Sequence, residues 1–147
     1  MGQLLAIARR DKKRADMQTL QSAHVSMHHG IAQDFRGKPG QRQVTILSTE
    51  AWSAACKDLN IELPWTTRRA NLLIQGLNLH SSAGKVICIG TVQFLITQET
   101  DPCERMEEAH PGLEKALTSA WRGGVCCRVL SEGNIQVGDP VRLEDAQ

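Results

Sequence analysis

Long hydrophobic runs are absent from this sequence. A membrane-spanning helix needs roughly 18 or more consecutive apolar residues, and Asn, Gln, Lys or Arg interrupts every candidate segment. The apolar stretch 4–8 precedes the basic cluster in 9–14, which reverses the charge order of a secretory signal peptide. The sequence therefore predicts a soluble, cytoplasmic protein that does not bind a membrane.

Cysteines with metal-ligand spacing are also absent. The chain has five cysteines, an odd number, and contains no Cys-x-x-Cys pair. An odd count without an export signal predicts reduced thiols rather than a disulfide framework. Structural zinc is not expected, because the ligand spacing that zinc sites use is missing.

The chain has little net charge. Its 17 Lys and Arg residues nearly balance 16 Asp and Glu residues, which leaves a formal charge of +1. Such a balance argues against nucleic acid as a partner. The composition, with 41% hydrophobic and 22% charged residues, is typical of a folded domain. A length of 147 residues suits one domain spanning 1–147.

Short apolar runs rich in Val, Ile and Leu dominate the pattern. They are too short for helices and several end in glycine-containing turns, so they are predicted to be strands. The segments are 4–8, 44–48, 71–74, 85–89, 92–97, 125–130 and 134–141. A mainly β fold with this many strands favours a closed barrel, because closure removes exposed strand edges. A sandwich is the alternative.

Two segments have helical spacing instead. Residues 50–59 place alanines and Leu59 on one face behind a Ser48 or Thr49 cap. Residues 111–121 form an apolar stripe that Gly123 and Gly124 are expected to end. Both predicted helices should pack against the sheet.

Several short motifs follow one another along the chain. Their order and spacing are more informative than any one of them. They are HGIAQDFRG at 29–37, RQVTIL at 42–47, EAW at 50–52, RANLLIQGL at 69–77, IG at 89–90, PC at 102–103 and GNIQVGD at 133–139.

In this order, the Gly-x-x-x-Asp loop, the Arg-x-Asn-Leu strand, the Pro-Cys pair and the terminal Gly-Asp turn resemble the MOSC domain, named after the C-terminal part of molybdenum cofactor sulfurases. The resemblance covers nearly the whole chain. It implies a MOSC-like β-barrel with a few short helices and a molybdopterin-type molybdenum cofactor. The cysteine of the Pro-Cys pair, the candidate molybdenum ligand or sulfur carrier, maps onto Cys103. The pyridoxal-phosphate desulfurase domain of larger relatives is missing, so no pyridoxal phosphate site is expected.

Cys103 has a local setting that bears on its reactivity. Asp101 could cap a short helix with Pro102 at its first position, which would put the thiol in the first turn, where the helix dipole favours a thiolate. Arg105 acts in the same direction, whereas nearby acidic residues such as Glu104 oppose it. A thiolate is the form that binds soft metals or carries a persulfide. An ordinary loop cysteine is the alternative.

Arginine forks and amides are the groups that recognise a cofactor's phosphate. The residues predicted to bind the cofactor are Arg69, Asn71, Arg42, Arg68, Arg122 and Asp34. Arg69 and Asn71 are the strongest candidates because they stand in the Arg-x-Asn-Leu motif, and they are expected to line the same concavity as Cys103. Asp34 could orient a loop amide or an arginine. For any single arginine, a solvated surface charge is the alternative.

Three functions remain open. The first is a molybdenum-cofactor oxidoreductase in which Cys103 binds the metal and N-hydroxylated compounds are reduced. Since no flavin, haem or iron–sulfur motif is present, such an enzyme requires a separate electron-donor protein. The second is a carrier of persulfide sulfur, supplied by a sulfur-donor protein, or a cofactor-delivery module. The third is a cofactor-free interaction domain.

Overall fold

A computed structural model describes residues 2–145. The strands are β1 (Gly2–Arg9), β2 (Gln18–Leu20), β3 (Ser22–Ser26), β4 (Gly30–Ile31), β5 (Val44–Ser48), β6 (Leu72–Gln75), β7 (Val86–Ile89), β8 (Val92–Glu99), β9 (Val125–Val129), β10 (Gly133–Gln136) and β11 (Pro140–Glu144). The helices are α1 (Thr49–Asp58), α2 (Glu104–Ala109) and α3 (Leu113–Thr118), with 3-10 turns η1 (Trp65–Arg68) and η2 (Ser119–Trp121).

Seven of these strands close into a barrel within residues 2–145. The hydrogen-bonded order is β1, β11, β7, β8, β9, β5, β6 and back to β1. Strands β5 and β6 pair in parallel, and the other neighbours in the ring are antiparallel. β2 extends the sheet from β1, and β10, β3 and β4 form a second small sheet. The prediction of a mainly β barrel is confirmed, and the sandwich alternative is wrong.

The inward faces of the strands fill the barrel. Along β8, Val92, Phe94 and Ile96 are buried and alternate with more exposed residues, which is the pattern of a strand with one face on a core. Phe94 is the largest fully buried side chain. The barrel interior is therefore a packed core, and a ligand site has to lie at its periphery.

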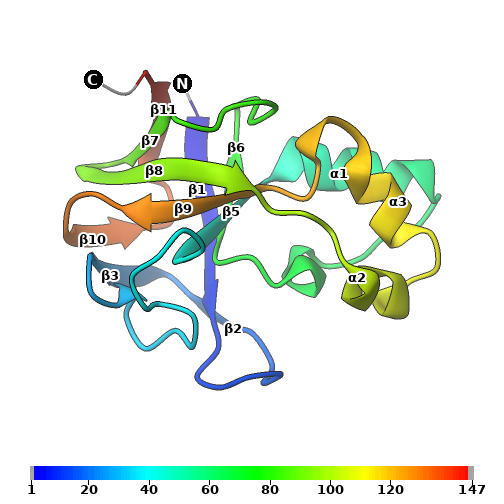
Figure 1. Ribbon diagram of the computed structural model, residues 1–147, viewed down its shortest axis with the longest axis horizontal. Helices are drawn as coiled ribbons and strands as arrows, with labels where there is room; N and C mark the ends of the chain where they lie inside the picture. Colours follow the sequence, from blue (N-terminus) through cyan, green and yellow to red (C-terminus); the bar gives the residue numbers. More distant parts are fainter. Residues whose placement is uncertain (1, 146–147) are drawn as a thin grey trace.

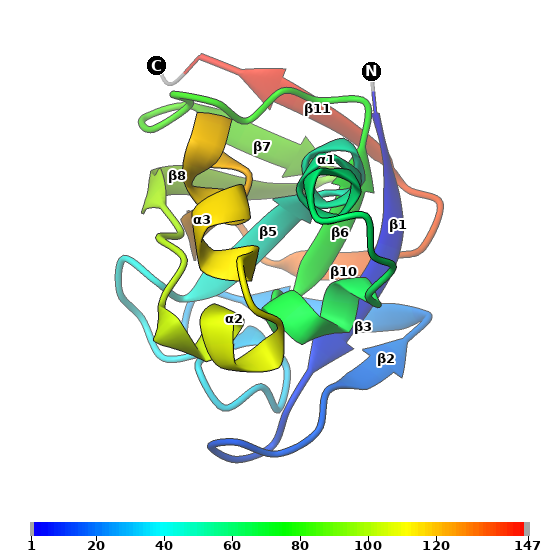
Figure 2. The same ribbon diagram turned by 90° about the vertical axis from the view of Figure 1, so that its right-hand side faces the viewer.

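A second apolar cluster lies between the barrel wall and the helices. Leu47 and Leu73, on the parallel pair β5 and β6, face Trp52 of α1 and Leu113 and Leu117 of α3. The three helices cover one side of the barrel (Figures 1 and 2). None of the helices in the described part of the chain is both long and apolar enough to span a bilayer.

Helix α1 begins as the sequence predicts. The Ser48 hydroxyl accepts a hydrogen bond from the Ala51 N–H at 3.2 Å, so Ser48 is the N-cap. The Trp52 indole N–H donates to the Leu63 carbonyl at 3.0 Å, which ties the helix to the loop that follows it. This loop leads into η1 and β6, the segment that carries the Arg-x-Asn-Leu motif.

Two local predictions were wrong, and three short strands were not predicted. Residues 134–141 form two strands instead of one, because Gly138 adopts a φ of 101° and the Asp139 carboxylate accepts from the Gln136 N–H at 2.9 Å in a turn. The helix predicted for 111–121 is α-helical only over Leu113–Thr118, because Ser119 has an extended backbone, and residues 119–121 form the 3-10 turn η2. Strands β2, β3 and β4 were not predicted, because their short segments contain too few apolar residues.

Candidate functional site

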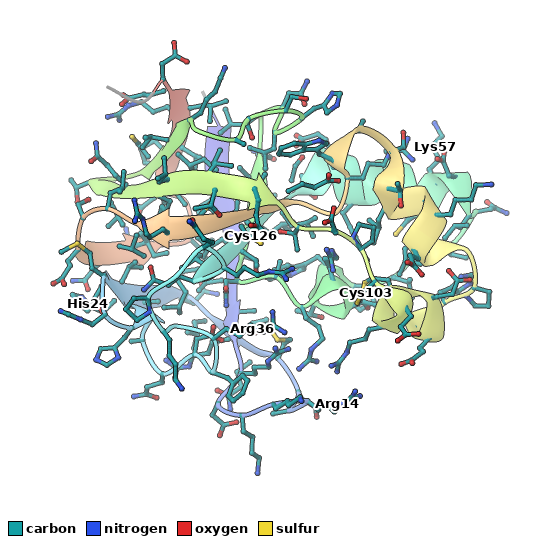
Figure 3. All side chains as sticks on the ribbon, in the orientation of Figure 1. Arg14, His24, Arg36, Lys57, Cys103 and Cys126 are labelled. Carbon is teal, nitrogen blue, oxygen red and sulfur yellow. The ribbon has the colours of Figure 1, made fainter. Side chains whose placement is uncertain are left out.

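A pocket of about 260 Å³ opens beside η1 and the start of α2. Segments far apart in sequence build it: the end of β1, the loop after β4, the N-terminal part of β5, residues 68–71, the β8–α2 connection and Gly123. Its charged and thiol-bearing residues are Arg10, Asp34, Arg36, Arg42, Arg68, Arg69, Asp101, Cys103 and Arg105. We call it the arginine pocket. Figure 3 shows Cys103 at the start of α2 and Arg36 on the loop that faces it.

Positive charge is concentrated here beyond what the pocket's own carboxylates neutralise. Six arginines and two aspartates line it, a formal excess of four positive charges. Burial lowers the pKa of Arg10 to about 10, and repulsion from Arg69 and Arg36 adds to the effect. Burial, followed by repulsion from Arg105, lowers the pKa of Arg69 as well. An anion bound among these groups would relieve the repulsion.

Asp34 shapes the wall through backbone contacts. Its carboxylate accepts from the Arg10 N–H at 3.1 Å and from the Arg36 N–H at 3.3 Å. The Arg10 guanidinium lies 5.8 Å from the centre of the Phe35 ring, within the range of a cation–π contact. Of the two roles considered for Asp34, the structure shows the orientation of loop amides.

Arg68 is buried and fastens the segment that leads to Cys103. Its guanidinium donates to the carbonyls of Gly123 at 3.0 Å, Thr100 at 2.9 Å and Asp101 at 3.4 Å. A Cβ on Gly123 would lie 2.6 Å from the Thr100 oxygen, so only glycine allows this approach. Burial lowers the pKa of Arg68, whereas the Cys103 thiol raises it.

Arg69 and Asn71 share the arginine pocket with Cys103, as expected. Arg69 has a left-handed backbone with φ of 65°, and its Nη2 donates to the Ala15 carbonyl, which ties the β1–β2 loop to this wall. Its Nε is buried without a hydrogen-bond partner in residues 2–145. The Asn71 amide accepts from the Thr45 N–H at 3.0 Å and donates to the Ala8 carbonyl at 3.2 Å. Asn71 therefore braces β5 against β1 beneath the pocket.

Cys103 is exposed at the mouth of the pocket, but its local geometry differs from the prediction. It is the N-cap of α2, with φ of −129° and ψ of 176°, so the thiol precedes the first turn. The expected cap at Asp101 was wrong by two residues. The Cys103 carbonyl accepts from the Met106 N–H at 2.8 Å, so the first turn begins after the thiol-bearing residue.

Arg122 does not line the arginine pocket, unlike Arg42 and the other arginines predicted for the cofactor. Its Nη1 donates to the Asp58 carboxylate at 2.5 Å and to the Ala116 carbonyl at 3.2 Å. This ion pair connects α1 to the turn after α3. Arg122 faces a different cavity of the molecule.

The other cysteines are buried. Cys126 and Cys127 leave opposite faces of β9, as predicted: Cys127 packs in the barrel core and Cys126 lies 3.3 Å from the Thr100 hydroxyl. Burial raises the pKa of Cys127 well above its usual value. Cys56 packs in the apolar cluster beneath the helices, as predicted. Cys88 was predicted to be an apolar filler as well, but it is buried beside Gln93, Arg142 and Glu144, and burial, followed by the Glu144 charge, raises its pKa. Cys103 is therefore the one exposed thiol in the described residues.

Sequence reasoning did not select three of the arginines. Arg10 directly follows β1 within the basic cluster, Arg36 lies two residues after the Asp of the Gly-x-x-x-Asp loop, and Arg105 follows Cys103 by two residues. Two of them stand inside or beside a motif, a signal that could have identified Arg36 and Arg105. Nothing in the sequence marks Arg10, whose position depends on the path of the β1–β2 loop.

Comparisons with known proteins agree with this architecture. The chain resembles the YUAD protein from Bacillus subtilis, with a TM-score of 0.81, 19% identity and coverage of 100% of this chain and 98% of that one. YiiM from Geobacillus stearothermophilus gives a TM-score of 0.78 at 20% identity, covering 99% of this chain and 76% of that one. YiiM from Escherichia coli gives 0.72 at 13% identity, covering 99% and 71%. At such identities the likeness shows the fold.

A search of curated proteins found no match. The sequence model of the MOSC domain, however, matches residues 22–142, which is most of the chain and includes the Arg-x-Asn-Leu strand and the Pro-Cys pair. The motif order, the closed barrel and this match agree. The chain belongs to the MOSC domain family.

Proposed function

We propose that the arginine pocket binds a molybdenum-pterin cofactor of the molybdopterin type, with Cys103 as the sulfur ligand of the metal. The MOSC family is associated with molybdenum cofactor binding. The observation that carries the proposal is the convergence of six arginines on one exposed thiol. Guanidinium groups suit the phosphate of a pterin cofactor, and a thiolate suits a soft metal.

The residues present fit such a group. Arg69 has a buried Nε with no partner in residues 2–145, so a donor is left for a bound anion. Burial, and after it repulsion from neighbouring arginines, lowers the pKa of Arg10 and Arg69, and a bound phosphate would offset the repulsion. No set of three His, Cys, Asp or Glu side chains in that range could hold a metal ion. A single thiol is thus what this pocket offers, and the pterin would provide the other ligands.

The protein's own residues then have separable duties. Arg36, Arg42 and Arg105 supply donors along the pocket wall, while Arg68 fixes the segment that carries Cys103. Asp34 and Asn71 hold the backbone around them. When bound, the cofactor would supply oxo-transfer chemistry, for which we propose N-hydroxylated compounds as substrates and a separate protein as electron donor.

The test is purification of the native protein followed by metal analysis and by detection of the oxidised pterin through its fluorescence. We expect stoichiometric molybdenum and pterin in the wild type. Cys103→Ser replaces a soft ligand with a hard hydroxyl at nearly constant volume, so molybdenum should be lost. Cys88→Ser is the control at a buried thiol, judged by molybdenum per folded protein. Wild-type protein without pterin, even after reconstitution, contradicts the proposal.

A second candidate function rests on the exposure of Cys103. An exposed thiolate can take the outer sulfur of a donor persulfide, which forms a Cys103 persulfide and releases the donor as a thiolate. In that case the chain is a sulfur carrier or a cofactor-delivery module without its own catalysis. Mass spectrometry after incubation with a persulfide donor would show one added sulfur on Cys103. Retention of molybdenum through purification distinguishes the enzyme from the carrier.

We also propose that residues 1–147 form one MOSC-like domain and that it works in the cytoplasm. The supporting observation is the state of the cysteines, since all five are free. Free thiols persist in reducing compartments. Fractionation of cells that express the untagged protein, with a periplasmic marker as reference, tests this location.

A further inference from the structure

A second cavity lies on the other side of the Gly123–Gly124 peptide from the arginine pocket. Its volume is about 430 Å³, and it shares no lining residue with the arginine pocket. The start of α1, the loop 76–80 after β6, residues 120–122 and Gly124 line it. Figure 2 shows these elements on the helical side of the barrel. We call it the tryptophan cavity, after Trp121 in its wall.

The charged groups that line the tryptophan cavity already have hydrogen-bond partners within the protein. The Glu50 carboxylate accepts from the Gly76 N–H at 3.1 Å and from the Ser48 hydroxyl at 3.1 Å, which joins α1 to the loop after β6. Arg122 forms its ion pair with Asp58 at 2.5 Å. The Arg122 charge is offset by Asp58, which leaves the single charge of Glu50, so charge contributes less to ligand selection here than in the arginine pocket.

The backbone of one wall is strained. Ala120 and Trp121 are consecutive non-glycine residues with φ of 52° and 58°, in the left-handed region that side chains rarely adopt. Such conformations persist where the surrounding structure holds them, and they occur often at ligand-binding positions. Here the strained turn presents Trp121, whose ring meets His80 edge-on with 6.3 Å between the ring centres.

We propose that the tryptophan cavity binds a neutral, planar aromatic molecule that carries a hydrogen-bond acceptor. The ring of Trp121 and the aliphatic side chains of Leu77 and Leu79 provide an apolar surface. Trp121 and His80 both line the cavity, and within residues 2–145 neither the indole N–H nor the imidazole makes a hydrogen bond, so both groups are available as donors. The volume lies in the range of small-molecule sites.

The test uses quinoline, a neutral bicyclic aromatic with one ring-nitrogen acceptor, in calorimetric titrations of the full chain. Two comparison probes lack the acceptor: indole carries an N–H donor in its place, and 1-methylquinolinium has its nitrogen lone pair replaced by an N-methyl group and bears a positive charge. We expect saturable one-to-one binding of quinoline, at least about fivefold tighter than either analogue, as the loss of one hydrogen bond implies.

Two variants place the site. Trp121→Gly removes the ring and suits the left-handed backbone, so the chain should fold and quinoline affinity should fall at least about tenfold. Trp65→Phe, in the cluster beneath the helices, is the control and should leave affinity within about twofold. The proposal is overturned if quinoline does not bind with a Kd below about 10 mM, if the analogues bind as well, or if Trp121→Gly binds like the wild type.

Discussion

Arg68 gives the sharpest test of how the fold holds Cys103 in place. The perturbation is Arg68→Met, which keeps an unbranched chain and removes every donor. Three carbonyls lose their partner: those of Gly123 at 3.0 Å, Thr100 at 2.9 Å and Asp101 at 3.4 Å. Hydrogen bonds from a charged group contribute about 1.5 to 3 kcal/mol each, so the two shorter ones alone are worth about 3 kcal/mol or more.

Relief of the buried charge offsets part of this loss. Burial lowers the pKa of Arg68, which shows that the charged form is disfavoured at this position, and methionine removes that penalty. We therefore expect the free energy of unfolding to fall by about 2 to 4 kcal/mol in Arg68→Met. Arg68→Lys keeps one positive charge without the planar guanidinium, so its free energy of unfolding should lie between those of the wild type and Arg68→Met.

Urea unfolding measures the loss, and hydrogen exchange shows where it acts. The Thr100 N–H, which donates to the Gly124 carbonyl at 2.9 Å, should lose protection in Arg68→Met. Arg42→Met is the control, because Arg42 lines the same pocket but is exposed, and it should change stability by less than about 0.5 kcal/mol. If Arg68→Met is as stable as this control and hydrogen exchange at Thr100 is unchanged, the hydrogen bonds of Arg68 do not hold the segment that leads to Cys103.

Three further outcomes follow from single contacts. Ser48→Ala removes the α1 cap and should lower the free energy of unfolding by about 1 kcal/mol, whereas Ser53→Ala, exposed on the same helix, should not; equal urea midpoints contradict the cap. Gly123→Ala places a Cβ 2.6 Å from the Thr100 oxygen and should lower the free energy of unfolding by about 1 to 3 kcal/mol in urea. An unchanged urea midpoint would show that the backbone around Gly123 can move apart without loss of stability. Burial raises the pKa of Cys127, so the folded thiol keeps its proton while the unfolded one loses it above pH 9.0. Stability should then fall with rising pH above that value by up to about 1.4 kcal/mol per pH unit, and Cys127→Ala should have a shallower slope.

The strands of the barrel could be predicted because each buries one apolar face. Residues 44–48 and 92–97 are rich in Val, Ile and Leu, and they are strands in the structure. The opposite holds for β3, whose Ser22–Ser26 segment contains two serines and a histidine and is a strand because it pairs with β10. Residue propensity predicts the strands that build a core. A strand that forms by pairing with a distant strand can be predicted only when the position of that partner strand is known.

The arginine pocket shows the same division between local and long-range information. Cys103, Arg69 and Asn71 could be selected because they stand in recognisable motifs, and the barrel brings them together. Their individual roles could not be predicted, because each depends on a contact more than fifty residues away in sequence: Arg68 with Gly123, Arg69 with Ala15, and Asn71 with Ala8. The two adjacent arginines bind opposite walls, since the left-handed backbone of Arg69 turns the chain between them. This turn leaves Arg68 to fix the thiol-bearing segment, and it leaves Arg69 with one donor that has no partner in residues 2–145, so two adjacent arginines perform two different tasks in one pocket.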